Sequence, residues 1–588
     1  MIAHAAAEGA FVAPAVEWVA LTPLIIVISA GVVGVLVESF VPARLRRTVQ
    51  VLLTTVSLAA ALGVIVWQGA TWIQSDGTGG KAVLGGALQL DGTALLFQGT
   101  IALLALLALL VVSDRTAAMQ SPFAPSAAAI PGSEYEDLAR RKGLEQTEAY
   151  PLLMFAVAGM LIFPAAGDLV TMFIALEVLS LPLYVLSGMA RRRRLLSQEA
   201  SFKYFVLGAF ASALFLFGTA LLYGYSGSVT LQGIGTASAT VAQGGAPENW
   251  ELLWLVGVLL VVSGLLFKVG AVPFQAWTPD VYQGAPTPIT GFMAACTKVA
   301  AFGALLRFLY MGGFIGSVEM LDSVKAALWV VAIATMIVGT VVGATQTDMK
   351  RMLGYSSIAH AGFVLVAILG FNGAGIKATI FYLLVYGLAT VGAFAVVTLV
   401  REVGPGGEIL GEATHLGQWA GLGRRRPWLA ASFALFLLSF AGIPLTGGFI
   451  AKYGAFAAAV EGNEVLGDAT VLAVVGVLAS AVAVFFYIRV VVIMFFTSPE
   501  GMAPVETTAS AGAEGSALDG SVEPAPGAET PDTARSSVLV ATGAPAVTVV
   551  RSEGMTAVTI GLTAAAVLVL GVFPSPVLDL VAHVTGIR

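Results

Sequence analysis

Four charged side chains lie inside segments that are otherwise apolar, and these are the residues best suited to do chemistry. Glu177 lies in LVTMFIALEVLSLPLYVL, and three further apolar runs contain Lys268, Lys298 and Lys452. A charged side chain near the centre of a bilayer costs about 2.5–3.5 kcal/mol, so such residues are rare and mark ion or proton pathways. Their number in one chain predicts a protein that moves protons or cations.

The choice of lysine favours titration over static pairing. Burial favours the neutral form of a lysine, whereas a nearby carboxylate favours the charged form. Movement of Glu177 toward or away from Lys268 would therefore switch that lysine between holding and releasing a proton. Arginine would remain protonated in the same place.

The composition restricts the protein to the membrane and leaves few ligands for a redox centre. Of 588 residues, 58% are hydrophobic and 11% are charged, which is far from a soluble globular chain. One cysteine, Cys296, and four scattered histidines exclude a cysteine-ligated iron–sulfur cluster on this chain. We therefore expect no cofactor and no metal here.

Apolar runs of about 20 residues, each long enough to cross a bilayer, recur along the chain and predict an all-α polytopic fold. The fourteen predicted spans are 16–40, 49–68, 92–113, 150–166, 168–188, 199–224, 251–276, 286–312, 325–345, 352–371, 376–400, 428–460, 470–497 and 555–580.

Basic residues gather in every second loop, which predicts that these loops face the cytoplasm and that both termini face outward. The expected cytoplasmic loops contain Arg44, Arg46, Arg47, Arg115, Arg140, Arg141, Lys142, Arg191 to Arg194, Lys350, Arg351, Arg401, Arg424 to Arg426, Arg535 and Arg551. The expected outer segments contain only Lys81, Lys325, Lys377 and Arg588.

Two spans carry glycine and proline next to a lysine, which predicts broken helices. Pro273 follows Lys268, and Pro444 precedes Lys452. Broken helices in corresponding halves are typical of inverted-repeat transporters. The sequence therefore predicts two inverted five-helix repeats, at 150–312 (spans four to eight) and 325–497 (spans nine to thirteen).

The remaining segments are an N-terminal three-helix part with its cytoplasmic loop (1–149), an insert (498–550) and a C-terminal helix (551–588). The insert is acidic and rich in proline, glycine and alanine, a composition that cannot bury enough apolar area to order the chain. We expect it to be disordered on the cytoplasmic side.

Five motifs make the chain similar to a known family. They are FIALEVLSLPLYVLSG (173–188), EASFKYFVLGAFASALFLFG (199–218), FKVGAVPFQAWTPDVYQGAPTPITGFMAACTKVAAFG (267–303), QTDMKRMLGYSSIAHAG (346–362) and GIPLTGGFIAKY (442–453). Over residues 150–500 the chain resembles the antiporter-like membrane subunits of respiratory complex I, the NADH:quinone oxidoreductase, and most closely the subunit N family.

The resemblance implies a proton-translocating subunit of a quinone-linked dehydrogenase. Glu177, Lys268, Lys298 and Lys452 match the family's ionisable positions, and His360 matches a polar position between the central and terminal lysines. FMN, iron–sulfur clusters, NADH and the quinone would be bound by other subunits. The partners would be the other membrane-arm subunits, including antiporter-like neighbours, and lipid.

Alternatives remain open at this stage. The chain could instead serve a multi-subunit cation/proton antiporter, a membrane-bound hydrogenase or, on weaker grounds, a stand-alone solute transporter. Glu177 and Lys268 could form a structural ion pair, and Lys298 could be a packing charge satisfied by carbonyls. Lys452 could extend to the outer interface, and His360 could be a hydrogen-bonded core histidine.

Overall fold

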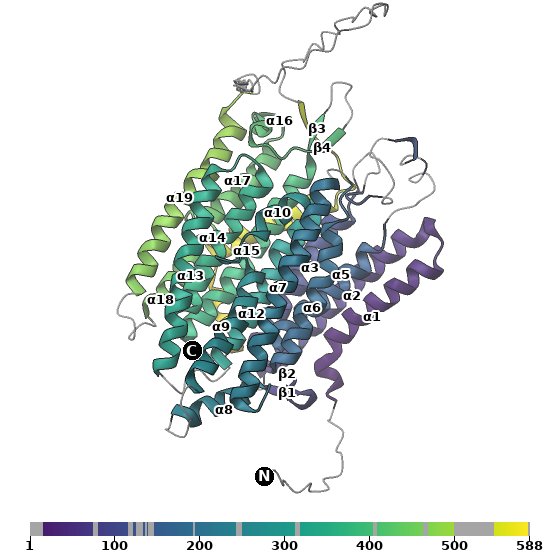
Figure 1. The fold of residues 1–588 in the computed structure, drawn as a ribbon. Coiled ribbons are helices and arrows are strands. Elements are labelled where there is room, and N and C mark those ends of the chain that lie inside the picture. The colour runs from purple at the N-terminus through teal and green to yellow at the C-terminus, as the bar shows by residue number, and fades with distance from the viewer. Residues whose placement is uncertain are drawn as a thin grey trace, which may run out of the picture.

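The computed structural model describes residues 16–74, 80–115, 121–124, 133–135, 138, 146–191, 194–242, 250–311, 318–403, 409–461, 469–498 and 546–585. Figure 1 shows a bundle of long helices, with β3, β4 and α16 at one end and α8, β1 and β2 at the opposite end. The predictions for most of 114–149 and for 499–545 lie outside the described residues.

Within those residues, twelve helices are long and apolar enough to cross a membrane. Two shorter apolar helices, Ala149–Ala165 and Pro427–Ala441, lie where the fourth and twelfth spans are predicted. These helices together coincide with the fourteen predicted spans, so the all-α polytopic fold is confirmed.

The described helical elements, in chain order, are α1 (Trp18–Phe40), α2 (Ala43–Gln74), η1 (Leu84–Gly86), α3 (Gly92–Ser113), α5 (Ala149–Ile162), η2 (Phe163–Ala165), α6 (Leu169–Ser187), α7 (Arg194–Ser226), α8 (Leu231–Ala242), α9 (Trp250–Val269), α10 (Trp277–Gly284), α11 (Thr287–Phe292), the π-helical turn η3 (Met293–Thr297), α12 (Lys298–Met311), α13 (Val318–Thr345), α14 (Met349–Ile368), α15 (Gly373–Leu399), η5 (Leu416–Trp419), α16 (Leu422–Arg425), α17 (Pro427–Ala441), α18 (Gly447–Glu461), α19 (Ala469–Phe496), α20 (Met555–Val572) and α21 (Ser575–Thr585).

Side-chain caps fix where several spans begin. Asp91, Asp168 and Asp348 accept backbone N–H bonds of 2.7, 2.7 and 3.0 Å at the starts of α3, α6 and α14. Asn372 does the same for α15 at 2.7 Å. Such caps satisfy backbone donors that have no partner within the helix, so these spans start sharply after short loops.

One predicted span is shorter in the structure, and two are divided. The span predicted at 251–276 ends as a helix at Val269, and the span predicted at 428–460 is divided between α17 and α18. The span predicted at 555–580 is divided between α20 and α21 at Pro574, because proline lacks the N–H that would continue the helix.

The breaks after α9 and α17 have the same backbone design. A glycine in the left-handed region follows each helix: Gly270 with φ of 73° and Gly442 with φ of 80°. The next N–H in each case bonds back to a leucine carbonyl five residues earlier, Ala271 to Leu266 at 3.0 Å and Ile443 to Leu438 at 3.1 Å. Both helices therefore end in a Schellman motif.

Two small sheets lie at opposite ends of the bundle (Figure 1). β1 (Lys81–Val83) and β2 (Leu88–Leu90) form an antiparallel hairpin. At the other end β3 (Val400–Val403) pairs antiparallel with both β4 (Ile409–Glu412) and β5 (Ala546–Val549). The predicted disorder of 498–550 is therefore wrong for β5, because its β-branched residues suit a strand and pair with the edge of β3.

The start of the first described helix and the end of the last one lie at the same end of the bundle. Gln68 donates a 2.7 Å hydrogen bond to the carbonyl of Val19, near the start of α1. Trp72 donates to the carbonyl of Val584, near the end of α21, at 3.2 Å. An even number of crossings requires this arrangement.

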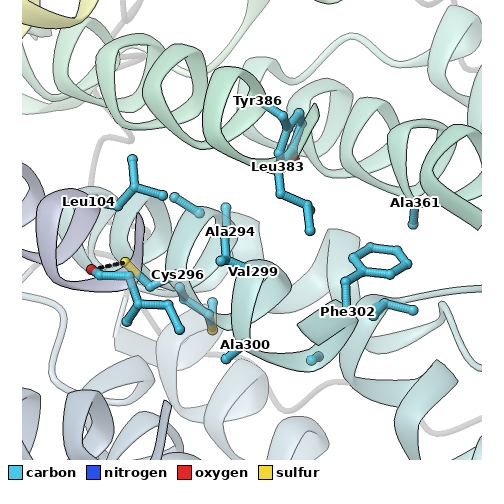
Figure 2. Close-up of a cluster of buried hydrophobic side chains, with 14 of the residues drawn as sticks. Leu104, Ala294, Cys296, Val299, Ala300, Phe302, Ala361, Leu383 and Tyr386 are labelled. Atoms are coloured by element: carbon cyan, nitrogen blue, oxygen red, sulfur yellow. Dashed lines mark hydrogen bonds between the residues drawn. The ribbon is translucent and has the colours of Figure 1, made fainter. Parts of the chain in front are cut away.

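The centre of the bundle is the helix that runs through α11, η3 and α12. A continuous stretch of 18 residues in this helix is entirely buried. Figure 2 shows Cys296, Val299 and Phe302 of this helix among side chains from neighbouring helices. The Cys296 Sγ lies 4.0 Å from the carbonyl oxygen of Ile101 in α3. Lys298 therefore starts α12 in the most enclosed part of the protein.

Candidate functional site

Lys298 binds the interrupted backbone at the end of α9. Its Nζ donates to the carbonyl of Val269, the last residue of that helix, at 2.7 Å and to the carbonyl of Ser357 at 2.8 Å. The residue is 3% exposed. Because the C-terminal end of a helix carries partial negative charge, it is a favourable place for a cation.

Lys452 binds the second break in the same way. Its Nζ donates to the carbonyl of Ala441, the last residue of α17, at 2.9 Å and to the Ser480 hydroxyl at 2.6 Å. The Ser480 hydroxyl also lies 3.3 Å from the Ala441 carbonyl. Lys452 is buried and directed at this break, so it does not extend to an outer interface in this structure.

Lys268 has different surroundings, although it is equally buried. Its Nζ has no hydrogen-bond partner and lies 5.0 Å from the ring centre of Tyr204, 5.2 Å from that of Tyr184 and 5.8 Å from that of Phe267. Aromatic faces at these distances attract a cation. A buried ammonium without a hydrogen-bond acceptor is costly, which is a strong indication that this lysine has a functional role.

Glu177 is bound to a serine rather than to a lysine. Its carboxylate accepts a hydrogen bond from the Ser212 hydroxyl of α7. Within the described residues no ion pair joins Glu177 to Lys268, so the structural ion pair that the sequence left open is not formed here. Tyr184, two helical turns beyond Glu177 on α6, contacts the lysine instead.

His360 lies between two tyrosine hydroxyls. Its Nδ1 is 2.7 Å from the Tyr382 hydroxyl and its Nε2 is 3.4 Å from that of Tyr487. Tyr487 in turn is hydrogen-bonded to Ser356. A cavity of about 10 Å³ beside the ring is about the size of one water molecule.

One face of α14 connects the two lysine sites. Ser357 accepts the bond from Lys298, His360 lies one turn later, and the Phe363 ring lies one turn beyond that, 4.7 Å from the Nζ of Lys452. Residues three apart are neighbours on the surface of a helix, so each of these groups adjoins the next. The structure therefore brings Lys298, His360 and Lys452 together along α14, with Lys268 next to the carbonyl that Lys298 binds.

A second set of charges, which the sequence did not predict, holds α10 beyond the first break. Asp280 accepts from Lys203 of α7 at 2.7 Å and from Arg351 of α14 at 2.6 Å. Partial burial raises the pKa of Asp280, but the hydrogen bonds and charges of Lys203 and Arg351 outweigh it and leave this pKa below its usual range. Asp280 therefore stays ionised near neutral pH and acts as a fixed charge.

Lys350, the neighbour of Arg351, holds the other end of α10. Its Nζ donates to the carbonyl of Ala285, which follows α10, at 2.7 Å and lies 3.5 Å from a Glu412 carboxylate oxygen. Glu412 also accepts from Thr287 at the start of α11. The charged residues of this contact lie in WTPDVYQG and DMKR. The sequence shows that they are charged but does not indicate that these two segments contact each other.

The described residues contain no group of three or more His, Cys, Asp or Glu side chains arranged to hold a metal ion. The groups that accept hydrogen bonds from Lys298 and Lys452 are backbone carbonyls and the Ser480 hydroxyl. They can hold and pass protons, since hydroxyls both donate and accept.

Comparison with known proteins identifies the family. A family model described as NADH:quinone oxidoreductase/Mrp antiporter, transmembrane, matches residues 166–483. NADH-quinone oxidoreductase subunit N of Beutenbergia cavernae is 56% identical over 579 residues, which cover 98% of this chain and 99% of the relative. The chain belongs to the NADH-quinone oxidoreductase subunit N family.

Solved structures agree with this family. A chain of respiratory complex I from Thermus thermophilus with bound aureothin is 29% identical, with a TM-score of 0.66 over 95% of this chain and 99% of that one. A chain of the Mrp complex from Dietzia shares the fold at 23% identity, with a TM-score of 0.68 over 97% of this chain and 96% of that one. The subunit N family is therefore better supported than the antiporter alternative, and it makes this chain a multi-pass protein of the bacterial inner membrane.

Proposed function

We propose that this subunit moves protons along a row of buried groups formed by Glu177, Lys268, Lys298, His360 and Lys452. The family establishes a proton-translocating membrane-arm subunit of NADH:quinone oxidoreductase. The observation that supports this particular route is the face of α14, on which Ser357, His360 and Phe363 connect the contacts of Lys298 and Lys452.

Each lysine in this row can respond to a change in its surroundings. Lys298 and Lys452 bind carbonyls at helix breaks, so a shift of either half-helix alters the number of acceptors around the ammonium. Lys268 lies against ring faces and has no hydrogen-bond partner, so a closer approach of Glu177 would add the carboxylate acceptor that the ammonium lacks. Opposite charge stabilises a protonated lysine, and its withdrawal would release the proton to the next group.

The matching breaks also support two inverted repeats, which we place at 150–312 and 325–497. Gly270 corresponds to Gly442. In the helix that follows each broken helix, one side chain donates to the carbonyl at the break: Lys298 to Val269, and Ser480 to Ala441. The bridge between Asp168 and Thr230 likewise has a counterpart between Asp348 and His415. In this division 1–149 and 551–588 are additions to the repeated core.

We further propose which subunits carry out electron transfer and on which side of the membrane the termini lie. NADH, FMN, the iron–sulfur clusters and the quinone are assigned to other subunits of the complex, and no cofactor is assigned to this chain. The antiporter-like subunits of the membrane arm are its neighbours. The end of the bundle with β1 and β2 faces outward, together with both termini, and the end with β3 faces the cytoplasm.

The test uses the purified assembly containing Lys268→Ala, reconstituted into vesicles, with NADH-driven proton uptake and quinone reduction followed together. We expect a complete assembly with little proton uptake and reduced coupled turnover. Lys81→Ala, at an exposed lysine of the outer hairpin, is the control and should behave as the unmodified protein. Unchanged uptake in Lys268→Ala would remove this lysine from the route.

A further inference from the structure

The partners of Lys268 in this structure are aromatic. The Nζ lies 5.0 Å from the ring centre of Tyr204 and 5.2 Å from that of Tyr184, within the range of cation–π attraction. The two rings stand edge to face, with centres 4.7 Å apart and planes at 88°, so they cover the ammonium from two directions. Neither hydroxyl donates to or accepts from the Lys268 Nζ, so the two tyrosines act on the lysine through their rings, alongside the charge of Glu177.

The position of Tyr184 depends on a glycine in the neighbouring helix. A Cβ at Gly208 of α7 would lie 2.0 Å from the Tyr184 hydroxyl oxygen, closer than any side chain permits. The absence of a side chain at 208 therefore allows the tyrosine to lie against α7, with its ring toward Lys268.

Tyr204 is connected to the helix break through a third aromatic residue. Its ring stacks on that of Trp277, with centres 4.6 Å apart and planes at 10°. Trp277 is the first residue of α10, and its Nε1 donates a 2.8 Å hydrogen bond to the carbonyl of Phe267, the residue before Lys268. A displacement of α10 relative to α9 would therefore move the ring that covers the lysine.

We propose that Tyr184 and Tyr204 are positioning residues that stabilise charged Lys268 through their ring faces, and that Trp277 makes this stabilisation depend on the position of α10. The inference rests on the proposed role of Lys268 in proton transfer. It assigns part of the stabilisation of that charge to the aromatic rings, beside the charge of Glu177, whose carboxylate is held by Ser212 and forms no ion pair with the lysine.

Ring electronics separate this role from simple packing. Tyr204→Phe keeps the ring and removes only a hydroxyl without a hydrogen-bond partner, so proton uptake per NADH by this variant is the reference for the fluorinated series. Phenylalanine analogues with one, two and three ring fluorines at position 204 keep the shape but weaken the negative face. Uptake should fall step by step, by roughly three- to tenfold for three fluorines, if the face holds the cation.

The same fluorinated series at Phe215 is the matched control. Phe215 lies on the same helix, is fully buried and packs against Phe173 with ring centres 6.2 Å apart. No graded change is expected there. Gly208→Ala is a second, independent variant, which should lower uptake by displacing Tyr184.

The outcomes distinguish the two levels of the proposal. Loss of uptake in Lys268→Ala, together with no dependence on fluorine number at position 204, would overturn the aromatic role and leave the proton route intact. Normal uptake in Lys268→Ala would overturn both. A graded fall at position 204 with none at Phe215 would establish the aromatic role.

Discussion

The Nζ of Lys298 lies 2.7 Å from the carbonyl oxygen of Val269, the last residue of α9, and donates a hydrogen bond to it. Lys452 makes the equivalent bond to Ala441, the last residue of α17, at 2.9 Å. Two buried lysines thus satisfy the carbonyls that two broken helices leave without a backbone partner. The interruption in the helix and the buried charge form one unit, so neither can change without the other.

The same substitution should have different effects on stability at two buried lysines. Lys298→Met leaves the Val269 and Ser357 carbonyls without the ammonium, and an unsatisfied buried acceptor costs about 1–3 kcal/mol. Lys268→Met removes an ammonium that has no hydrogen-bond partner, so it should be close to neutral. Heat inactivation of the two purified assemblies measures the difference, and equal midpoints would contradict the capping role of Lys298.

Gly442→Ala should destabilise the second break and displace Lys452. The left-handed backbone costs an alanine about 1–2 kcal/mol, and the added Cβ would lie 2.8 Å from the Lys452 Cδ. We expect a lower midpoint of heat inactivation and weaker proton uptake. Gly561→Ala in α20 is the control, since a Cβ there meets nothing within 4 Å. Equal heat-inactivation midpoints and equal proton uptake in the two variants would refute the role of Gly442 at the break.

Tyr382→Phe should impair His360 without disturbing assembly. It removes the 2.7 Å contact with Nδ1 and leaves that buried nitrogen unsatisfied, at a cost of about 1–3 kcal/mol. Proton uptake should fall severalfold in reconstituted vesicles. Tyr453→Phe removes a hydroxyl from a side chain that is 67% exposed and should have no effect. If Tyr382→Phe pumps normally, the histidine is a core residue only.

Asp280→Asn should loosen α10 through the loss of one charge. The carboxylate lies between Lys203 and Arg351, and a partly exposed pair contributes about 1 kcal/mol or less. Because the pKa of Asp280 is below its usual range, its contribution is complete near neutral pH and is lost only as the pH falls through that pKa. The difference in heat stability should therefore be constant from about pH 6 to 8. Glu199→Gln, at the exposed partner of Lys203, should lower the heat stability less. An equal effect of the two variants would argue that Asp280 does not hold α10 in place.

Much of the fold followed from local sequence signals. Span positions depend on apolar length, and the breaks depend on the glycine and proline near Lys268 and Lys452, so both could be predicted from short windows. The division at Pro574 was missed because a single proline near the end of an apolar run can either kink or end a helix. β5 was missed because three β-branched residues carry little weight beside a long polar insert.

The partners of the site residues could not be predicted in the same way. Lys298 binds carbonyls 29 and 59 residues away in sequence, and any residue provides a carbonyl. Tyr184 and Tyr204 look like ordinary core residues of apolar helices, and only the packing of α6 on α7 and of α7 on α9 places them on Lys268. Ser212, the partner of Glu177, is one of many serines in the apolar helices.

The central claim is that the buried lysines must release their protons, and Lys298→Arg tests it most directly. A guanidinium can still donate to two carbonyls but does not lose its proton in a protein. The measurement is the number of protons taken up per NADH oxidised by the reconstituted assembly, with subunit content and heat stability matched to the unmodified protein. The account predicts a complete assembly with a sharply lowered ratio. An unchanged ratio would show that Lys298 need not release a proton and would contradict the proposed route.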